Sequence, residues 1–176
     1  SWGVGTNLIT SKDCPAFGGV YKLAAIRQPD GSFLPKIKLS ENTEKVTNPG
    51  NKKIIRIYEK DSHEIKADLI TLVEETFDPE QDLTIFDPIE TWKKTTLKGG
   101  TYEMREIMVP VFKDGVCVYE SPAVMDIRQY AIEEQNTLWD ESRRLINPHQ
   151  VYVDLSDKLY AMKKQLIQDY SMKIHK

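Results

Sequence analysis

The run Lys52-Lys-Ile-Ile-Arg-Ile-Tyr-Glu-Lys60, followed by Ile65-Lys-Ala-Asp-Leu-Ile-Thr-Leu-Val73, decides the fold class of this chain. Both runs are rich in β-branched residues, which favour strands. In the second run apolar and polar residues alternate, which is the period of a strand with one buried face. The polar turn Asp61-Ser62-His63 separates them. We therefore predict two neighbouring strands.

Two more strands are predicted upstream, over Val20–Arg27 and Phe33–Ser40. Between them lies Pro29-Asp30-Gly31, a strong turn signal because proline fixes φ and glycine accepts a positive φ. Apolar residues alternate with lysines in Phe33–Ser40, so one face of this pair is expected to be solvated. Four successive strands with short polar turns predict an antiparallel sheet over residues 19–75.

Downstream of an acidic linker, Glu74–Asp82, the sequence predicts a second and smaller β unit within residues 76–120. It would contain Leu83–Phe86, a long strand over Tyr102–Phe112, and Val116–Tyr119. The turn Lys113-Asp114-Gly115 is typical of a hairpin.

The C-terminal segment, residues 121–176, is predicted to be mostly helical. Ser121-Pro122 forms an N-cap and first-position pair for a helix that runs to about Ile146. A short extended piece over Val151–Val153 follows, and Ser156 is predicted to cap a last helix. The apolar stripe of that helix consists of Leu159, Met162, Leu166 and Tyr170.

Composition restricts the class of protein. The chain has 176 residues, 40% of them hydrophobic, so it is long enough for one medium domain or two small ones with a true core. A net charge of −3 argues against nucleic-acid binding, which needs clustered Lys and Arg. No apolar run is long enough to span a membrane, and no secretory signal is visible. Cys14 and Cys117 have no metal-like spacing and are expected to be reduced cytosolic thiols, although spacing alone leaves a disulfide open.

The N-terminal run Ser1-Trp-Gly-Val-Gly-Thr-Asn-Leu-Ile-Thr10 contains the one candidate ligand site. Gly3 and Gly5 permit a tight turn, and Thr6 can cap a short helix. Unpaired N–H groups at such a turn favour a phosphate, with Asn7 as a further neighbour. The competing interpretation is an ordinary glycine turn at the end of a strand, which the bare pattern favours.

Other polar residues are assigned to the surface. His63, His149 and His175 lack acidic neighbours at a metal-binding spacing, so no metal site is predicted. The carboxylate pairs Glu133-Glu134 and Asp140-Glu141 are expected to form a solvated, salt-bridged helix face. Trp92 and Trp139 are expected to be packing residues. No catalytic residue is assigned to this segment.

Several blocks, in this order, together resemble the C-terminal part of nicotinate phosphoribosyltransferases. The agreement covers about residues 1–75 and 121–170, and it is weakest over 76–120, where we expect an addition to the family's common core. The blocks are Gly3–Thr10, Cys14–Leu23, Lys36–Glu41, Lys45–Lys52, Arg56, Arg144–His149 and Val153–Tyr160.

The resemblance implies an enzyme of pyridine nucleotide salvage, a ligase and glycosyltransferase. This family joins nicotinate to phosphoribosyl pyrophosphate to give nicotinate mononucleotide, an entry step of NAD biosynthesis, with ATP hydrolysis and Mg²⁺. It also implies a cytoplasmic homodimer. Within this segment it assigns Gly3, Gly5, Thr6 and Asn7 to binding of the ribosyl 5′-phosphate.

The implied fold is a type II phosphoribosyltransferase of mixed α/β and α+β character. Residues 1–18 would close an irregular α/β barrel, 19–75 would form an antiparallel sheet, 76–120 an added small β unit, and 121–176 the C-terminal helices. The chain would be one piece of a longer protein, inactive alone, with apolar surface bared where the N-terminal part packs. Two alternatives stay open: a sister enzyme for nicotinamide or quinolinate, and a non-catalytic β-rich interaction module.

Overall fold

A four-stranded sheet organises the computed structural model, which describes residues 3, 5–10, 15–16, 19, 21–40, 46–87, 89–90 and 92–174. Its central strands are β3 (Lys52–Glu59) and β4 (Ile65–Leu72), which pair antiparallel. Both strands begin where the sequence predicts and end one residue earlier. Alternation places Ile57, Ala67 and Leu69 in the core, so the predicted pair is confirmed.

The two outer strands come from distant segments. β7 (Tyr102–Glu106) pairs antiparallel with β3, and β10 (Val153–Leu155) pairs parallel with β4, giving the order β10-β4-β3-β7. The sequence predicts a separate β unit over residues 76–120. This prediction is wrong for β7, which pairs with β3 of the central sheet. The sheet is therefore assembled from three parts of the chain, and its last strand breaks the expected antiparallel pattern.

The first hairpin is shorter than predicted and does not join this sheet. β1 (Ala25–Arg27) and β2 (Phe33–Pro35) form a two-stranded sheet of their own. The longer strands predicted over Val20–Arg27 and Phe33–Ser40 are wrong. Upstream of β1 the side chains of Tyr21 and Leu23 are 101% and 62% exposed, so no burial offsets the entropy of ordering a longer strand.

Two more hairpins complete the β structure. β5 (Leu83–Phe86) was predicted, but its partner β6 (Lys94–Leu97) was not. β8 (Phe112–Lys113) and β9 (Val116–Cys117) flank the predicted Asp114-Gly115 turn, whose φ angles of 50° and 80° fit this pair of residues.

Three helices are present among the described residues: α1 (Thr6–Thr10), α2 (Val124–Asn136) and α3 (Asp157–Ile174). Ser121 does not cap α2, since the N-cap is Ala123. The predicted end near Ile146 is also wrong, because the helix stops at Thr137. The Thr137 carbonyl accepts a hydrogen bond from Ile65 N at 2.8 Å, which diverts the backbone toward β4. The predicted cap of α3 is confirmed: Ser156 Oγ accepts from Leu159 N at 3.2 Å.

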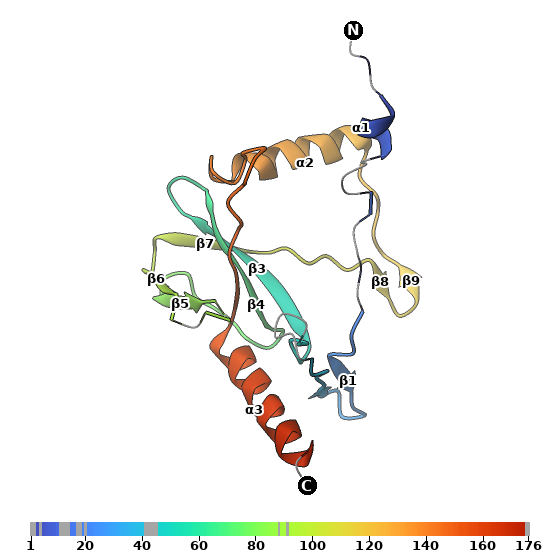
Figure 1. The fold of residues 1–176 in the computed structure, drawn as a ribbon, viewed down its shortest axis with the longest axis vertical. Helices are drawn as coiled ribbons and strands as arrows, with labels where there is room; N and C mark the ends of the chain where they lie inside the picture. Colours follow the sequence, from blue (N-terminus) through green and yellow to red (C-terminus); the bar gives the residue numbers. More distant parts are fainter. Residues whose placement is uncertain are drawn as a thin grey trace.

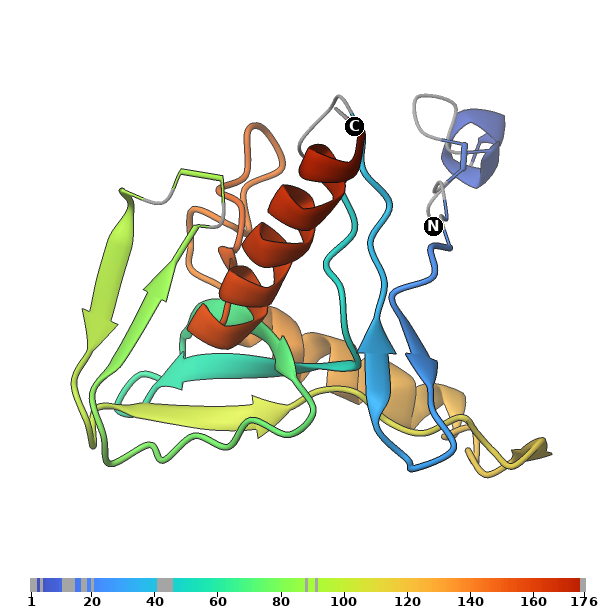
Figure 2. The same cartoon turned by 90° about the horizontal axis from the view of Figure 1, so that it is seen from below.

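Helices α2 and α3 lie on either side of the sheet (Figure 1). The β5–β6 hairpin stands on the α3 side (Figure 2), where the rings of Phe86 and Tyr160 are 5.2 Å apart. Two buried clusters result. One joins the β3–β4 core to β5 and β6, and the other joins Leu72 and Leu155 to Leu159 of α3.

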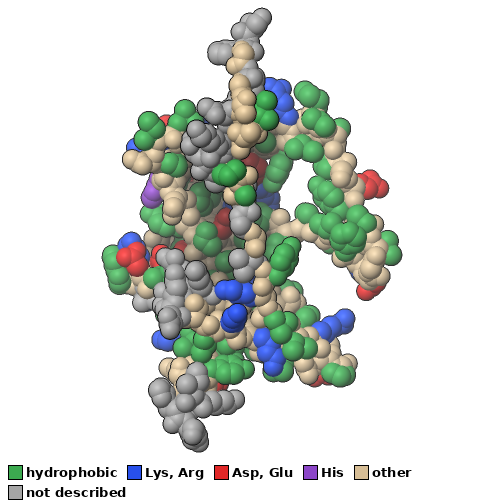
Figure 3. All heavy atoms as spheres, turned by 45° about the vertical axis from the view of Figure 1, so that its right-hand side comes forward, with side chains coloured by type: hydrophobic (Ala, Val, Ile, Leu, Met, Phe, Trp, Pro, Cys, Tyr) green, Lys and Arg blue, Asp and Glu red, His purple; other side chains and the backbone are tan. Residues whose placement is uncertain are grey.

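Large apolar side chains are exposed along an arm that extends from β7 through the β8–β9 hairpin, residues 107–119. Figure 3 shows hydrophobic side chains along it. Phe112 is 69% exposed and Val116 64%. The exposed members are Met108, Val109, Val111, Phe112, Val116, Val118 and Tyr119.

Candidate functional site

The predicted phosphate turn lies at the start of α1. Gly3, Gly5 and Thr6 are exposed, and Gly5 O accepts from Ile9 N at 3.4 Å, so Gly5 directly precedes the helix. A Cβ atom added at Gly3 or Gly5 meets nothing within 4 Å, so no steric contact of the described chain requires glycine at either position. The side chain of Asn7 lies outside the described part of the structure. In both views α1 stands apart from the four-stranded sheet (Figures 1 and 2).

Of the predicted carboxylate pairs, Glu134 of α2 and Asp140 after it form ion pairs, Asp140 with Arg143. Glu134 binds two arginines of the sheet: Arg56 Nη1 donates to Oε2 at 3.1 Å, and Arg105 Nη2 donates to Oε1 at 2.7 Å. Arg56 also makes a bidentate pair with Asp68, at 2.7 and 2.8 Å. The hydrogen bonding of Arg56 to the Asp68 carboxylate, which accepts from the guanidinium, is the main cause that raises the pKa of Arg56, which therefore stays charged. This network attaches α2 to the sheet and has no free catalytic group.

The histidines that are described do not form a metal site. His63, with φ 58°, stacks on Tyr58 at 4.4 Å, and His149 stacks on Trp139 at 5.4 Å. His175 lies outside the described residues. Among those described, no group of three or more His, Cys, Asp or Glu side chains could hold a metal ion. They do not fit a Mg²⁺ site, and we derive no step through that ion.

The thiol of Cys117 is exposed, and its Sγ donates to Tyr119 O at 3.7 Å. Cys14 lies outside the described residues. No helix in the described part of the chain is long and apolar enough to cross a membrane.

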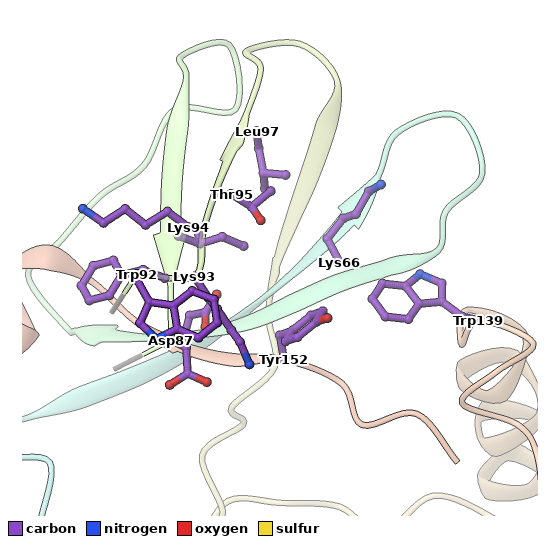
Figure 4. Close-up of a pocket in the computed structure, with 12 residues that line it drawn as sticks. Lys66, Asp87, Trp92, Lys93, Lys94, Thr95, Leu97, Trp139 and Tyr152 are labelled. Carbon is purple, nitrogen blue, oxygen red and sulfur yellow. The ribbon is translucent and has the colours of Figure 1, made fainter. Parts of the chain in front are cut away.

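A cavity of about 510 Å³ opens between the β5–β6 hairpin, β10 and the segment after α2. Buried Ile85, Phe86 and Leu97 belong to its lining. Figure 4 shows Trp92 and Lys93 on one side, Trp139 on the other and Tyr152 between them. The Trp139 and Tyr152 rings are 6.1 Å apart, in an edge-to-face arrangement. The remaining lining residues are Lys66, Asp87, Lys94, Thr95 and Asp154.

Asp154 is the unusual member of this lining. It lies in β10 beside Leu69 of β4 and is only 5% exposed. No hydrogen bond or ion pair links its carboxyl group to any described residue, although buried polar groups normally have partners. Burial, and second the negative charge of Asp87, raise the pKa of the Asp154 carboxyl to about 6. An ionisable group that lacks a protein partner, has a shifted pKa and faces a cavity marks a candidate binding site.

Sequence reasoning missed this cavity. Trp92 and Trp139 were predicted to be packing residues, yet Trp92 is 74% exposed. The signal that was available is the Asp of Val153-Asp-Leu155, a charged residue between two apolar ones in an extended segment. Its surroundings could not be predicted, because β5, β6 and the residues after α2 meet only in the folded chain.

Comparison with known proteins decides the family. Residues 51–163 match the sequence model of the nicotinate phosphoribosyltransferase C-terminal domain, which is more than half of the chain. The chain belongs to the nicotinate phosphoribosyltransferase family. The matched range includes residues 76–120, where the sequence blocks show the weakest resemblance.

Individual members of the nicotinate phosphoribosyltransferase family agree with this assignment. The Bacillus subtilis nicotinate phosphoribosyltransferase is 38% identical over 174 residues, covering 98% of this chain and 35% of that protein. The human protein of that name is 30% identical over 165 residues, covering 93% of this chain and 29% of the relative. The crystal structure of human nicotinic acid phosphoribosyltransferase superposes with a TM-score of 0.56 at 25% identity, over 68% of this chain and 23% of that one. The chain thus spans between 27% and 35% of the length of these curated relatives.

Proposed function

We propose that this chain forms the C-terminal part of an enzyme that joins nicotinate to phosphoribosyl pyrophosphate, releasing nicotinate mononucleotide and pyrophosphate. The observation that carries the proposal is the family match over residues 51–163. Relatives from bacteria and animals are named for this activity.

The proposed contribution of this segment to the site is the turn of Gly3, Gly5 and Thr6, with Asn7 beside it. Backbone N–H groups at the start of a helix favour a phosphate, and the Thr6 hydroxyl adds a donor. No described neighbour lies within 4 Å of a Cβ atom added at Gly5, so the described packing leaves room for a phosphate beside the backbone there. We assign this place to the 5′-phosphate of the ribosyl group.

In this mechanism the turn anchors the end of the ribose that does not react. Holding the phosphate fixes the sugar while the bond to pyrophosphate breaks and C1 takes on oxocarbenium character. The described residues supply no general base, and none is needed, because the nicotinate nitrogen is itself the nucleophile. Coupling to ATP, a requirement for Mg²⁺, a homodimer and a cytoplasmic location remain part of the proposal on family grounds.

The exposed apolar arm of residues 107–119 supports the placement of this chain within a longer protein. Exposed apolar surface of this extent commonly marks an interaction site. We propose that the N-terminal part, including the barrel that residues 1–18 would close, packs against such surface.

The experiment is steady-state kinetics on full-length enzyme carrying Gly5→Val. The KM for phosphoribosyl pyrophosphate should rise about tenfold or more, because the side chain occupies the space of the phosphate, a loss of about 1.4 kcal/mol or more. Thr6→Ala should raise it about fivefold, as expected for one lost hydrogen bond of about 1 kcal/mol. Gly19→Val is the matched control, since its added Cβ also meets nothing within 4 Å.

An unchanged KM in Gly5→Val, with full activity, would reject the phosphate assignment. Assays with nicotinamide and quinolinate in place of nicotinate test the sister activities. Absence of turnover with all three bases would favour the non-catalytic interaction module.

A further inference from the structure

We propose that the cavity beside β10 binds a small organic cation with a flat apolar body, held by the Asp154 carboxylate and by the rings of Trp92, Trp139 and Tyr152. The proposal is independent of the catalytic activity proposed above, because none of these residues belongs to the phosphate turn.

The Asp154 carboxylate has no partner among the described residues. Asp154 is 5% exposed and lines the cavity, and no described residue donates a hydrogen bond to it. Its oxygens open onto the cavity rather than onto a protein donor, and burial of the rest of the residue disfavours the charged form, as its raised pKa indicates. A cation in the cavity would offset that penalty.

The lysines of the lining do not pair with Asp154. Lys66 pairs with Glu59 and Lys93 pairs with Glu90, and Lys94, the third lysine of the lining, forms no ion pair with Asp154 in the described structure. Apart from burial, the influence that raises the pKa of Asp154 is the negative charge of Asp87. The immediate surroundings of the Asp154 carboxylate therefore favour a positive group.

The walls of the cavity suit a small aromatic cation in size and chemistry. A volume of about 510 Å³ suits a small molecule. Trp139 and Tyr152 meet edge to face at one side of the cavity, and Trp92 lies at the opposite side (Figure 4). Aromatic faces attract cations, and Lys93 Nζ already lies 5.1 Å from the centre of the Trp92 ring. Buried Ile85, Phe86 and Leu97 suit an apolar ring rather than a fully polar ligand.

The test compares two probes of nearly equal shape on the full-length protein. Benzamidine is a planar cation that can pair bidentately with a carboxylate, whereas benzamide is neutral. Isothermal titration calorimetry should give an affinity for benzamidine about tenfold or more above that for benzamide, as a charge-assisted pair predicts. The indole N–H resonances of Trp92 and Trp139 should shift on binding.

Two variants separate this site from any other. Asp154→Asn keeps the shape but removes the charge, and should reduce the benzamidine preference to about one. Asp114→Asn removes an equal charge from the exposed β8–β9 turn, where φ is 50°, and should leave the preference unchanged. Binding of either probe at the catalytic centre would not respond to Asp154.

Three results would overturn the proposal. One is equal affinity for the two probes in the unmodified protein. Another is a benzamidine preference that survives Asp154→Asn, with folding verified by circular dichroism. The third is failure of benzamidine to bind to the full-length protein. This would mean that a Lys or Arg from the remainder of that protein already pairs with Asp154.

Discussion

Arg56 and Glu134 are 78 positions apart in the sequence, yet Arg56 Nη1 donates to Glu134 Oε2 at 3.1 Å. The same carboxylate accepts two further bonds from Arg105 Nη2, at 2.7 and 2.8 Å. Helix α2 has no buried residue, so this ion pair network is its principal attachment to the sheet.

Glu134→Gln should therefore release α2 from the sheet. The loss is about 1–3 kcal/mol, as for hydrogen bonds between charged groups. Hydrogen exchange of the α2 amides should accelerate more than exchange in β3 and β4. Glu133→Gln is the matched control, because Glu133 is exposed and accepts only from Gln129 in the described structure. Equal effects of both substitutions would contradict this role for Glu134.

Asp154→Asn should stabilise the protein at pH 8. The folded-state pKa of Asp154 is raised from 3.8 to about 6, so the folded protein binds more protons than the unfolded one between these values. Stability conferred by this site thus falls as pH rises from about 4 to 6 and stays low above. Asn removes that cost, about 3 kcal/mol at pH 8 and about 0.5 kcal/mol at pH 4. Urea unfolding at both pH values measures the difference.

Asp82→Asn provides a control of opposite sign. Lys98 and the Gly99 amide lower the pKa of Asp82, so its carboxylate adds stability that is present at neutral pH and lost in acid. The substitution should destabilise at pH 8 and have less effect at pH 4. A loss of stability in Asp154→Asn at pH 8 would contradict the burial argument.

Ser156→Ala should cost about 1–2 kcal/mol, because one hydroxyl serves two roles. Ser156 Oγ accepts from Leu159 N at the start of α3 and donates to the buried Glu75 Oε2 at 2.7 Å. Ser142→Ala is the comparison, since the buried Ser142 Oγ has no hydrogen-bond partner in the described structure. Thermal unfolding should show a lower midpoint for the first variant and little change for the second.

Gly50→Ala should destabilise more than Gly115→Ala. Both glycines have positive φ, 89° and 80°, so both substitutions carry backbone strain of about 1–2 kcal/mol. Only at Gly50 would the new Cβ approach Leu72 Cδ2 to 2.7 Å, which adds overpacking of about 1–3 kcal/mol. Comparing the free energies of unfolding of the two variants in denaturant separates the cost of the positive φ angle from the cost of the close contact with Leu72. Equal losses would mean that Leu72 moves aside freely.

Local patterns predicted the parts of the fold that depend on local chemistry. The alternation in Lys52–Val73 predicts β3 and β4 within one residue, and Asp114-Gly115 predicts the last hairpin, since each needs only its own side chains. The end of α2 could not be predicted in this way, because it depends on the Ile65 amide reaching Thr137 from another part of the chain.

The same distinction between local and long-range dependence applies to the two candidate sites. The phosphate turn is a contiguous motif, so sequence alone brings Gly3, Gly5 and Thr6 to attention. The cavity at Asp154 is assembled from four separated segments, and no spacing rule relates Trp92 to Trp139. Its decisive property, a carboxylate without a partner, exists only after folding.

The parallel pairing of β10 with β4 has a consequence for synthesis on the ribosome. Val153 pairs with Asp68, so one edge of β4 stays open until about eighty more residues have been translated. At roughly 5–20 residues per second this takes on the order of 4–16 seconds. During that interval the nascent chain presents an apolar strand edge around Leu69 and Ile70, which is a template for intermolecular pairing. Slow translation of this region or loss of chaperone capacity should therefore reduce the soluble yield more than it reduces the stability of the finished protein.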